Sequence, residues 1–220
     1  MRIAVAATAP FGADVLERLA VTNEVTQLLT RPDAPSGRGR KLASSAAKDA
    51  AERLGIPVIH DRDQLDADTV VVAAYGLLIP ESALSRALWL NVHPSLLPRW
   101  RGAAPVERSL MAGDTETGVT IHRTTKELDA GPIAAQKAFP IAPDDDAGVV
   151  YARAAEIAAR LLDEVMANPS FTPQPDDGAT YAEKIAPEDR ELDLSLPPQE
   201  LVNRVRALSP HIGARMNGLI

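Results

Sequence analysis

The sequence predicts an α/β fold in which a mostly parallel, Rossmann-like β-sheet carries helices on both faces. Short apolar runs of strand length alternate along the chain with segments whose apolar residues recur at helical spacing. The most strongly β-branched run, residues 69–74 (TVVVAA), has the composition of a buried central strand. Because parallel strands are joined by crossover connections, this alternation favours a sheet that is covered on both sides.

The first half of the chain contains four predicted strands and three predicted helices. The strands are expected at residues 2–7, 25–30, 56–60 and 69–74, and the helices at 13–20, 45–54 and about 81–87. Ser44 or Ser45 can cap the second helix, and Gly55 can end it. Residues 33–41 are rich in Pro and Gly and have no apolar periodicity, which predicts a mobile loop.

The second half continues the pattern with strands at residues 88–93, 119–123 and 133–141 and helices at 105–111, 147–166 and 201–208. Pro105 suits the first turn of its helix, and Gly113 stands just past the end of it. Pro140 cannot donate to a ladder, so the last strand is predicted at an edge. The acidic residues 144–146 are interpreted as a helix cap rather than a metal site.

Composition places limits on the class of protein. The 220 residues predict one large domain, or one domain and a fragment of another, and 45% hydrophobic residues allow a sizeable core. The absence of cysteine excludes disulfides, thiolate catalysis and zinc–thiolate sites. No apolar run reaches the length of a membrane span, and the apolar amino end is interpreted as a buried strand rather than a secretory signal. We therefore expect a soluble, cytoplasmic protein with no membrane association.

Asn91 and His93 are the first candidate functional residues. They stand two apart at the carboxyl end of a predicted strand, so their side chains share one face of the sheet. Open α/β sheets bind ligands at this edge. An amide donor beside a titratable imidazole suits acyl transfer. On spacing alone, a strand-end cap and an edge histidine remain the more frequent outcome.

Several motifs together resemble the folate-dependent formyltransferase family. They are Asn91-x-His93, the segment Ser95-Leu96-Leu97-Pro98, Arg101-Gly102, and Asp129 within LDAGP. The resemblance runs from Met1 to about residue 210, and the basic segment 31–41 and residues 180–184 (TYAEK) are similar to the members that act on tRNA. It implies a formyltransferase fold with three groups of site residues. These are catalytic Asn91, His93 and Asp129; folate-binding Ser95, Leu96, Leu97 and Pro98; and tRNA-binding Arg38, Arg40 and Lys41.

The reaction implied by the resemblance moves a formyl group from 10-formyltetrahydrofolate to the free amine of methionine on initiator tRNA, without a metal. Asn91 and a protonated His93 would donate hydrogen bonds to the developing oxyanion, and Asp129 would hold His93 in its charged form. From the residues alone, Asp129 is more simply a turn residue. We expect the protein to act as a monomer.

The charge distribution bears on the tRNA partner. The net charge of −7 counts against nucleic-acid binding, because phosphate contacts supply much of the affinity. Residues 31–53 nevertheless carry six basic and three acidic side chains, a local excess of three positive charges. Gly37-x-Gly39 lacks the third glycine of a dinucleotide fingerprint, since Leu42 stands in its place, which argues against NAD.

The sequence departs from the pattern of the family in two respects, and two alternative functions remain open. Pro94 follows the histidine where the family usually has Gly. We expect residues 1–172 to form the catalytic domain, and residues 173–220 to be a linker with the incomplete start of a C-terminal domain. The alternatives are a formyltransferase for an aminosugar nucleotide or another small amine, and a catalytically silent folate- or nucleotide-binding module.

Two further interpretations concern other parts of the site. Residues 75–80 (YGLLIP) are core by composition, and by the resemblance they wall a pterin pocket. His60, His122 and His211 have no partner at ligand spacing and are interpreted as structural or exposed.

Overall fold

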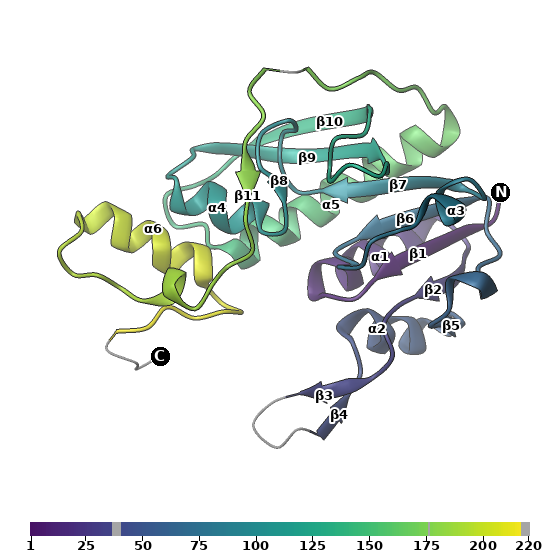
Figure 1. Ribbon diagram of the computed structural model, residues 1–220, viewed down its shortest axis with the longest axis horizontal. Helices are drawn as coiled ribbons and strands as arrows, with labels where there is room; N and C mark the ends of the chain where they lie inside the picture. Colours follow the sequence, from purple (N-terminus) through teal and green to yellow (C-terminus); the bar gives the residue numbers. More distant parts are fainter. Residues whose placement is uncertain (37–40, 176, 217–220) are drawn as a thin grey trace.

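The computed structural model describes residues 1–36, 41–175 and 177–216, and its centre is a seven-stranded sheet in the order β10-β9-β7-β6-β1-β2-β5 (Figure 1). The strands are β1 (Ile3–Ala7), β2 (Val25–Leu29), β5 (Val58–Ile59), β6 (Thr69–Ala73), β7 (Leu88–His93), β9 (Glu116–Arg123) and β10 (Ile133–Pro140). The first five are parallel, and β9 and β10 extend the sheet in antiparallel fashion. The predicted mostly parallel sheet is confirmed, with β6 in the middle and β10 at the edge.

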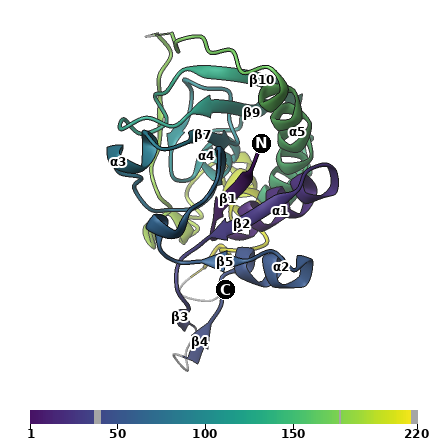
Figure 2. The same ribbon diagram turned by 90° about the vertical axis from the view of Figure 1, so that its right-hand side faces the viewer.

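Three long helices cover one face of the sheet. They are α1 (Pro10–Thr22), α2 (Ala46–Leu54) and α5 (Ala147–Ala167), which lie side by side (Figure 2). Their apolar stripes pack on alternate strand residues such as Val5, Val71 and Leu90 to form the larger core. The core is aliphatic and rich in alanine, as the composition predicts.

The opposite face has a thinner cover. A smaller cluster around Val70, Val72 and Trp89 packs beneath the short helix α3 (Glu81–Leu84) and the chain that follows the 3₁₀ turn η1 (Arg62–Gln64). Helices on both faces are therefore confirmed, although α3 is shorter than the predicted helix at 81–87. Trp89 Nε1 donates to the carbonyl oxygen of Ala83 at 2.9 Å, which gives that carbonyl a partner outside the helix.

Local capping signals act as the sequence predicts at three helices. Ser45 Oγ accepts from Lys48 N at 3.1 Å, and Gly55 ends α2 in the left-handed region. Asp146 caps α5 by accepting from Val149 N at 3.0 Å. Pro105 begins α4 (Pro105–Met111). These bonds satisfy backbone groups that each helix end leaves without an internal partner.

The start of α1 differs from the prediction. The helix begins at Pro10 rather than at residue 13, because proline fits the first turn of a helix. Position 12 requires glycine because the backbone of β6 lies too close for a side chain, and not because of an unusual φ angle. A Cβ there would lie 2.3 Å from the carbonyl oxygen of Ala73, so only glycine lets α1 approach the end of β6.

The segment predicted as a mobile loop, residues 33–41, contains strands. β3 (Ala34–Ser36) pairs antiparallel with β4 (Lys41–Ala43), and the hairpin projects from the body of the molecule (Figure 1). Its short strands carry no apolar alternation, so no periodic signal predicts them. Residues 37–40 lie outside the described residues.

The chain after α5 runs back along the end of β10 and along β8. Thr172 bridges Ile133, and β11 (Tyr181–Ala182) pairs in parallel with β8 (Arg101–Gly102). The 3₁₀ turn η2 (Glu188–Arg190) leads to α6 (Pro198–Leu208), which packs on α4. The predicted helix at 201–208 is confirmed and starts three residues earlier. Within the described ranges, no helix is both long and apolar enough to cross a membrane.

Candidate functional site

A cavity of about 540 Å³ lies at the carboxyl ends of the central parallel strands. Its wall combines Ala9 and Phe11 after β1, residues 74–79 after β6, and residues 91–94 at the end of β7. The loop between β9 and β10 closes another side with residues 124–129. Ligands bind at this edge of open α/β sheets, and the predicted pterin wall at residues 75–80 does line the cavity except for its last residue.

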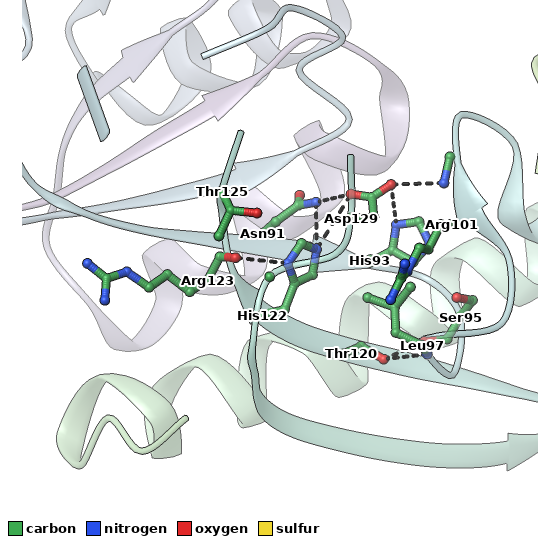
Figure 3. A network of polar contacts seen from close by, with 12 residues as sticks. Asn91, His93, Ser95, Leu97, Arg101, Thr120, His122, Arg123, Thr125 and Asp129 are labelled. Carbon is green, nitrogen blue, oxygen red and sulfur yellow. Dashed lines mark hydrogen bonds and ion pairs between the residues drawn. The ribbon is translucent and has the colours of Figure 1, made fainter. Parts of the chain in front are cut away.

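The three predicted catalytic side chains meet in this wall (Figure 3). Asn91 Nδ2 donates to Asp129 Oδ1 at 2.9 Å. His93 Nδ1 lies 3.6 Å from Asp129 Oδ2. Asn91 and His93 point to the same face of β7, as their spacing predicts, and Asp129 reaches them from the β9–β10 loop.

Asp129 is held by backbone as well as by side chains. Its own backbone has a φ of +48°, a left-handed conformation that Asp and Asn adopt more readily than most residues. Its Oδ2 accepts from the backbone N–H of Gly102 at 2.9 Å. Gln174 Nε2 donates to the carbonyl oxygens of Asp129 at 2.7 Å and Gly131 at 2.8 Å. The carboxylate is therefore fixed from β7 and β8, and its backbone is fixed from the chain beyond α5.

The electrostatics of the trio differ between its two ionisable members. Burial acts to raise the pKa of Asp129, but contacts with His122, His93 and the Gly102 N–H outweigh it and lower that pKa to about 2. Burial lowers the pKa of His93 below its usual 6.5, against the opposing effect of Asp129. Desolvation of the ring outweighs the nearby carboxylate and favours the neutral form of His93, and the protonated His93 of the reaction stays a prediction.

His122 belongs to the same network, and sequence reasoning did not include it in the site. Its ring is almost fully buried, and Nδ1 lies 3.1 Å from the carbonyl oxygen of Arg123. Since a carbonyl only accepts, Nδ1 carries the proton and Nε2 accepts from Asn91 Nδ2 at 3.0 Å. Both amide hydrogens of Asn91 are thus engaged, and one must change partner before Asn91 can donate to a bound carbonyl oxygen. The register that places His122 opposite Asn91 is a long-range pairing of β7 with β9, which local spacing does not reveal.

The predicted folate contacts at Ser95, Leu96, Leu97 and Pro98 are not in the cavity wall. Their polar groups are satisfied inside the loop and against β9. Ser95 Oγ donates to the Arg99 carbonyl at 2.7 Å, and the Leu97 N–H donates to Thr120 Oγ1 at 3.2 Å. Leu97 is also buried. The segment supports the end of β7 from behind, while Pro94 and Gly102 reach the cavity, and a folate-binding role for residues 95–98 stays a prediction.

The remaining candidates lie elsewhere. Arg38 and Arg40 are outside the described residues, as is the side chain of Lys41. Asp145 pairs with Arg153 at 2.8 Å and Asp146 caps α5, so both have structural partners. In the part of the chain that the structure describes, no group of three or more His, Asp or Glu side chains is arranged to hold a metal ion.

Comparison with known proteins identifies the class. Residues 1–166 match the family model described as formyl transferase, and the chain therefore belongs to the formyl transferase family. A relative in that family is the methionyl-tRNA formyltransferase of Nitrosospira multiformis, which is 41% identical over 240 aligned positions covering 100% of this chain and 77% of the relative.

Solved structures show the same fold. An N-formyltransferase from Helicobacter canadensis, in complex with folinic acid and dTDP-3-aminofucose, superposes with a TM-score of 0.75 at 18% identity, covering 99% of this chain and 85% of that one. A methionyl-tRNA formyltransferase from Clostridium thermocellum gives a TM-score of 0.71 at 15% identity, with coverages of 98% and 86%. The formyltransferase fold expected from the sequence is confirmed.

Proposed function

We propose that the chain transfers a formyl group from 10-formyltetrahydrofolate to the free α-amine of methionine carried by initiator tRNA. The observation that carries the proposal is the convergence of Asn91, His93 and Asp129 in one cavity wall, in a chain that is 41% identical along its whole length to a methionyl-tRNA formyltransferase. Initiator tRNA as acceptor also favours the expected cytoplasmic location.

The cavity fits a folate. Leu77, Leu78 and Leu128 are exposed large apolar side chains at its margin, and they can cover the faces of a flat heterocycle. The backbone of residues 75–79 and 124–128 offers donors and acceptors to the edge of such a ring. These two segments therefore join Ser95, Leu96, Leu97 and Pro98 as the proposed folate-binding residues.

The bound folate supplies the formyl carbon, and side chains of the protein accept and return the proton that the attacking amine loses. His93 Nε2 lies 2.8 Å from the Trp100 carbonyl oxygen and must donate to it, so in the neutral ring the lone pair is on Nδ1. Nδ1 is thus the nitrogen that accepts the proton lost by the attacking amine. Asp129, ionised at neutral pH and 3.6 Å away, then stabilises the imidazolium that forms. His93 returns this proton to the folate nitrogen as the bond between that nitrogen and the formyl carbon breaks, so that tetrahydrofolate leaves.

Asn91 acts as the donor toward the carbonyl oxygen of the transferred group. Of its two amide hydrogens, the one shared with His122 is the more easily redirected, because the other meets a charged acceptor. A donor of this kind is worth about 3 kcal/mol in acyl-transfer enzymes. No metal is needed for this chemistry.

The acceptor enters where the cavity wall is apolar. Phe11, Pro105 and Tyr151 line this part, and their surfaces suit the thioether side chain of methionine. The tRNA itself would be held by Arg38, Arg40 and Lys41, because their segment has a local excess of positive charge in a chain of net charge −7.

A direct assay tests the proposal. The protein is incubated with 10-formyltetrahydrofolate and either methionyl-initiator tRNA, an aminosugar nucleotide or no acceptor, and release of tetrahydrofolate is followed. We expect release only with the charged tRNA, and we expect His93→Ala and Asn91→Ala in folded protein to reduce kcat by about tenfold or more. Release with the sugar alone would select the other acceptor, and no release with either would remove the enzymatic proposal.

A further inference from the structure

Glu107 is a buried carboxyl group that the proposed chemistry does not use. It lies in the first turn of α4, and its side chain is almost inaccessible. Its Oε2 accepts a hydrogen bond from Tyr151 Oη at 2.9 Å. Tyr151 belongs to α5 and lines the cavity, where its ring is 5.3 Å from that of Phe11, centroid to centroid. A single hydrogen bond therefore connects Glu107 with the wall of the candidate site.

The carboxyl makes no ion pair within the described part of the chain, and Arg108 and His211 act on it only as nearby charges. The neighbouring Arg108 turns its guanidinium to Asp189, at 2.7 Å, and to the Glu183 carbonyl, at 3.0 Å. Burial raises the pKa of Glu107 above its usual value, and burial also raises the pKa of Tyr151 well above its usual 10.0. The pair is consequently a neutral hydroxyl donating to a carboxyl group of weakened acidity.

Such a pair is a poor way to stabilise a core. A buried polar group gains little net stability from its hydrogen bond, and apolar residues of the same volume often serve as well. A hydrogen bond does fix the orientation of the tyrosine side chain, whereas packing of its ring alone does not. Pro105 and Tyr151 lie on different helices and line the same part of the cavity as Phe11, so their spacing depends on how α4 is held against α5.

We propose that Glu107 is a positioning residue for the acceptor: its hydrogen bond fixes Tyr151 in the apolar part of the cavity that receives the methionine side chain. This inference rests on the proposed function. Glu107 touches neither the folate segments nor the Asn91, His93 and Asp129 side chains. Its loss should therefore affect recognition of the acceptor and leave the chemical step and the folate site unchanged.

Three substitutions test the proposal by steady-state kinetics with both substrates. Tyr151→Phe removes the hydroxyl and keeps the ring, Glu107→Leu removes the acceptor at similar volume, and Glu107→Gln keeps an acceptor oxygen. We expect the first two to raise the KM for methionyl-tRNA about tenfold, the equivalent of one hydrogen bond, with kcat and the KM for folate within about twofold. Glu107→Gln should restore a KM near that of wild type.

The double variant Tyr151→Phe/Glu107→Leu gives the sharper result. If one bond carries both effects, the double variant should be no worse than either single variant. Additive effects, equal losses for Gln and Leu at position 107, or a fall in kcat with unchanged KM would overturn the proposal. Thermal unfolding of each variant identifies a folding defect, and Tyr151→Phe remains informative if Glu107→Leu does not fold. Failure of wild type to formylate methionyl-tRNA would instead count against the proposed function.

Discussion

Asn91 Nδ2 lies 2.9 Å from Asp129 Oδ1, so the amide at the end of β7 and the carboxylate of the β9–β10 loop are joined across 38 residues of chain. The Gly102 N–H donates to the other carboxylate oxygen, also at 2.9 Å. Three segments of the chain, β7, β8 and the β9–β10 loop, are therefore held together at the site by hydrogen bonds. Such preorganisation lets polar groups act without reorganisation cost during the reaction.

Asp129→Asn tests the charge of the carboxylate with little change in shape. Asparagine tolerates the φ of +48° and can still accept from the Gly102 N–H. It cannot stabilise an imidazolium at His93, so we expect kcat to fall by about 10² to 10³ with the KM for folate nearly unchanged. Steady-state kinetics check this, with circular dichroism as the control for folding. A kcat within a few-fold of wild type would remove Asp129 from the mechanism.

The pH dependence of kcat/KM should report His93. Burial lowers its pKa below 6.5, and the neutral ring is the form that accepts the proton. The rate should therefore show one inflection from the α-amine of the substrate, whose ordinary pKa is about 7.7–8.0, and a second inflection from His93 at the lowered pKa. Rate profiles between pH 4.5 and 9, buffered at constant ionic strength, measure both inflections. A second inflection at or above 6.5 would contradict the lowered pKa of His93.

Asp129 should also contribute to the acid sensitivity of the fold. Its folded pKa of about 2 lies below its usual 3.8, so its stabilising effect is fully present above 3.8 and is lost as the pH falls through 2. The contribution is about 2 kcal/mol. Urea unfolding at pH 6 and pH 2.5 should show a smaller loss of unfolding free energy in Asp129→Asn than in wild type. Equal losses would mean that the carboxylate has no such role.

Gly102→Ala should weaken both the fold and the site. The residue has a φ of +120°, and an added Cβ would lie 2.6 Å from the Ala182 carbonyl oxygen, so β8 would have to move away from β11 and carry its N–H away from Asp129. We expect a loss of about 2 kcal/mol of unfolding free energy and a lower kcat.

The matched control for that variant is Gly55→Ala at the end of α2. It also has a left-handed backbone, with a φ of +70°, but nothing within 4 Å of the added atom. It should cost about 1 kcal/mol and leave kcat unchanged. Denaturant unfolding and kinetics on both variants separate backbone strain from displacement of the site. Equal kcat values for the two would contradict the argument.

Arg38→Ala tests the proposed tRNA contact. Removing one phosphate contact should raise the KM for tRNA and reduce the slope of log affinity against log salt by about 1, without changing the KM for folate. Kinetics at several potassium chloride concentrations measure both. Arg53→Ala, which removes a basic side chain paired with Glu17 at 2.5 Å on the surface of α2, is the comparison for a general loss of positive charge. Identical behaviour of the two variants would leave Arg38 without a specific role.

Most of the fold followed from local signals. The β-branched run at β6, Pro140 at the edge and the caps at Ser45 and Asp146 each depend on chemistry within a few residues, and all were predicted. The β3–β4 hairpin was missed because its strands have no apolar side to bury. The truncated α3 was missed because the hydrogen bond from Trp89 to Ala83 is a contact that no spacing encodes.

The same distinction between local and long-range signals applies to the residues of the candidate site. Asn91 and His93 could be placed on one face by strand periodicity, whereas Asp129 required the family resemblance, since a loop residue 36 positions downstream of His93 has no periodic relation to it. The sequence alone does not reveal that His122 and Glu107 belong to the site or lie beside it. Their importance depends on the pairing of β7 with β9 and on the packing of α4 against α5.

Residues between Thr172 and Ala182 brace two loops that come much earlier in the chain, the β9–β10 loop and the loop that contains Trp100 and Arg101. Gln174 holds the backbone of Asp129 and also accepts from Arg101, and Thr180 receives the N–H groups of both Trp100 and Arg101. A shorter version of the protein ending at Asn168, the residue that caps the end of α5, would keep every candidate catalytic side chain and lose this brace. We expect such a truncation to bind folate yet turn over slowly, because the sheet and its helices alone would not hold Asp129 in place.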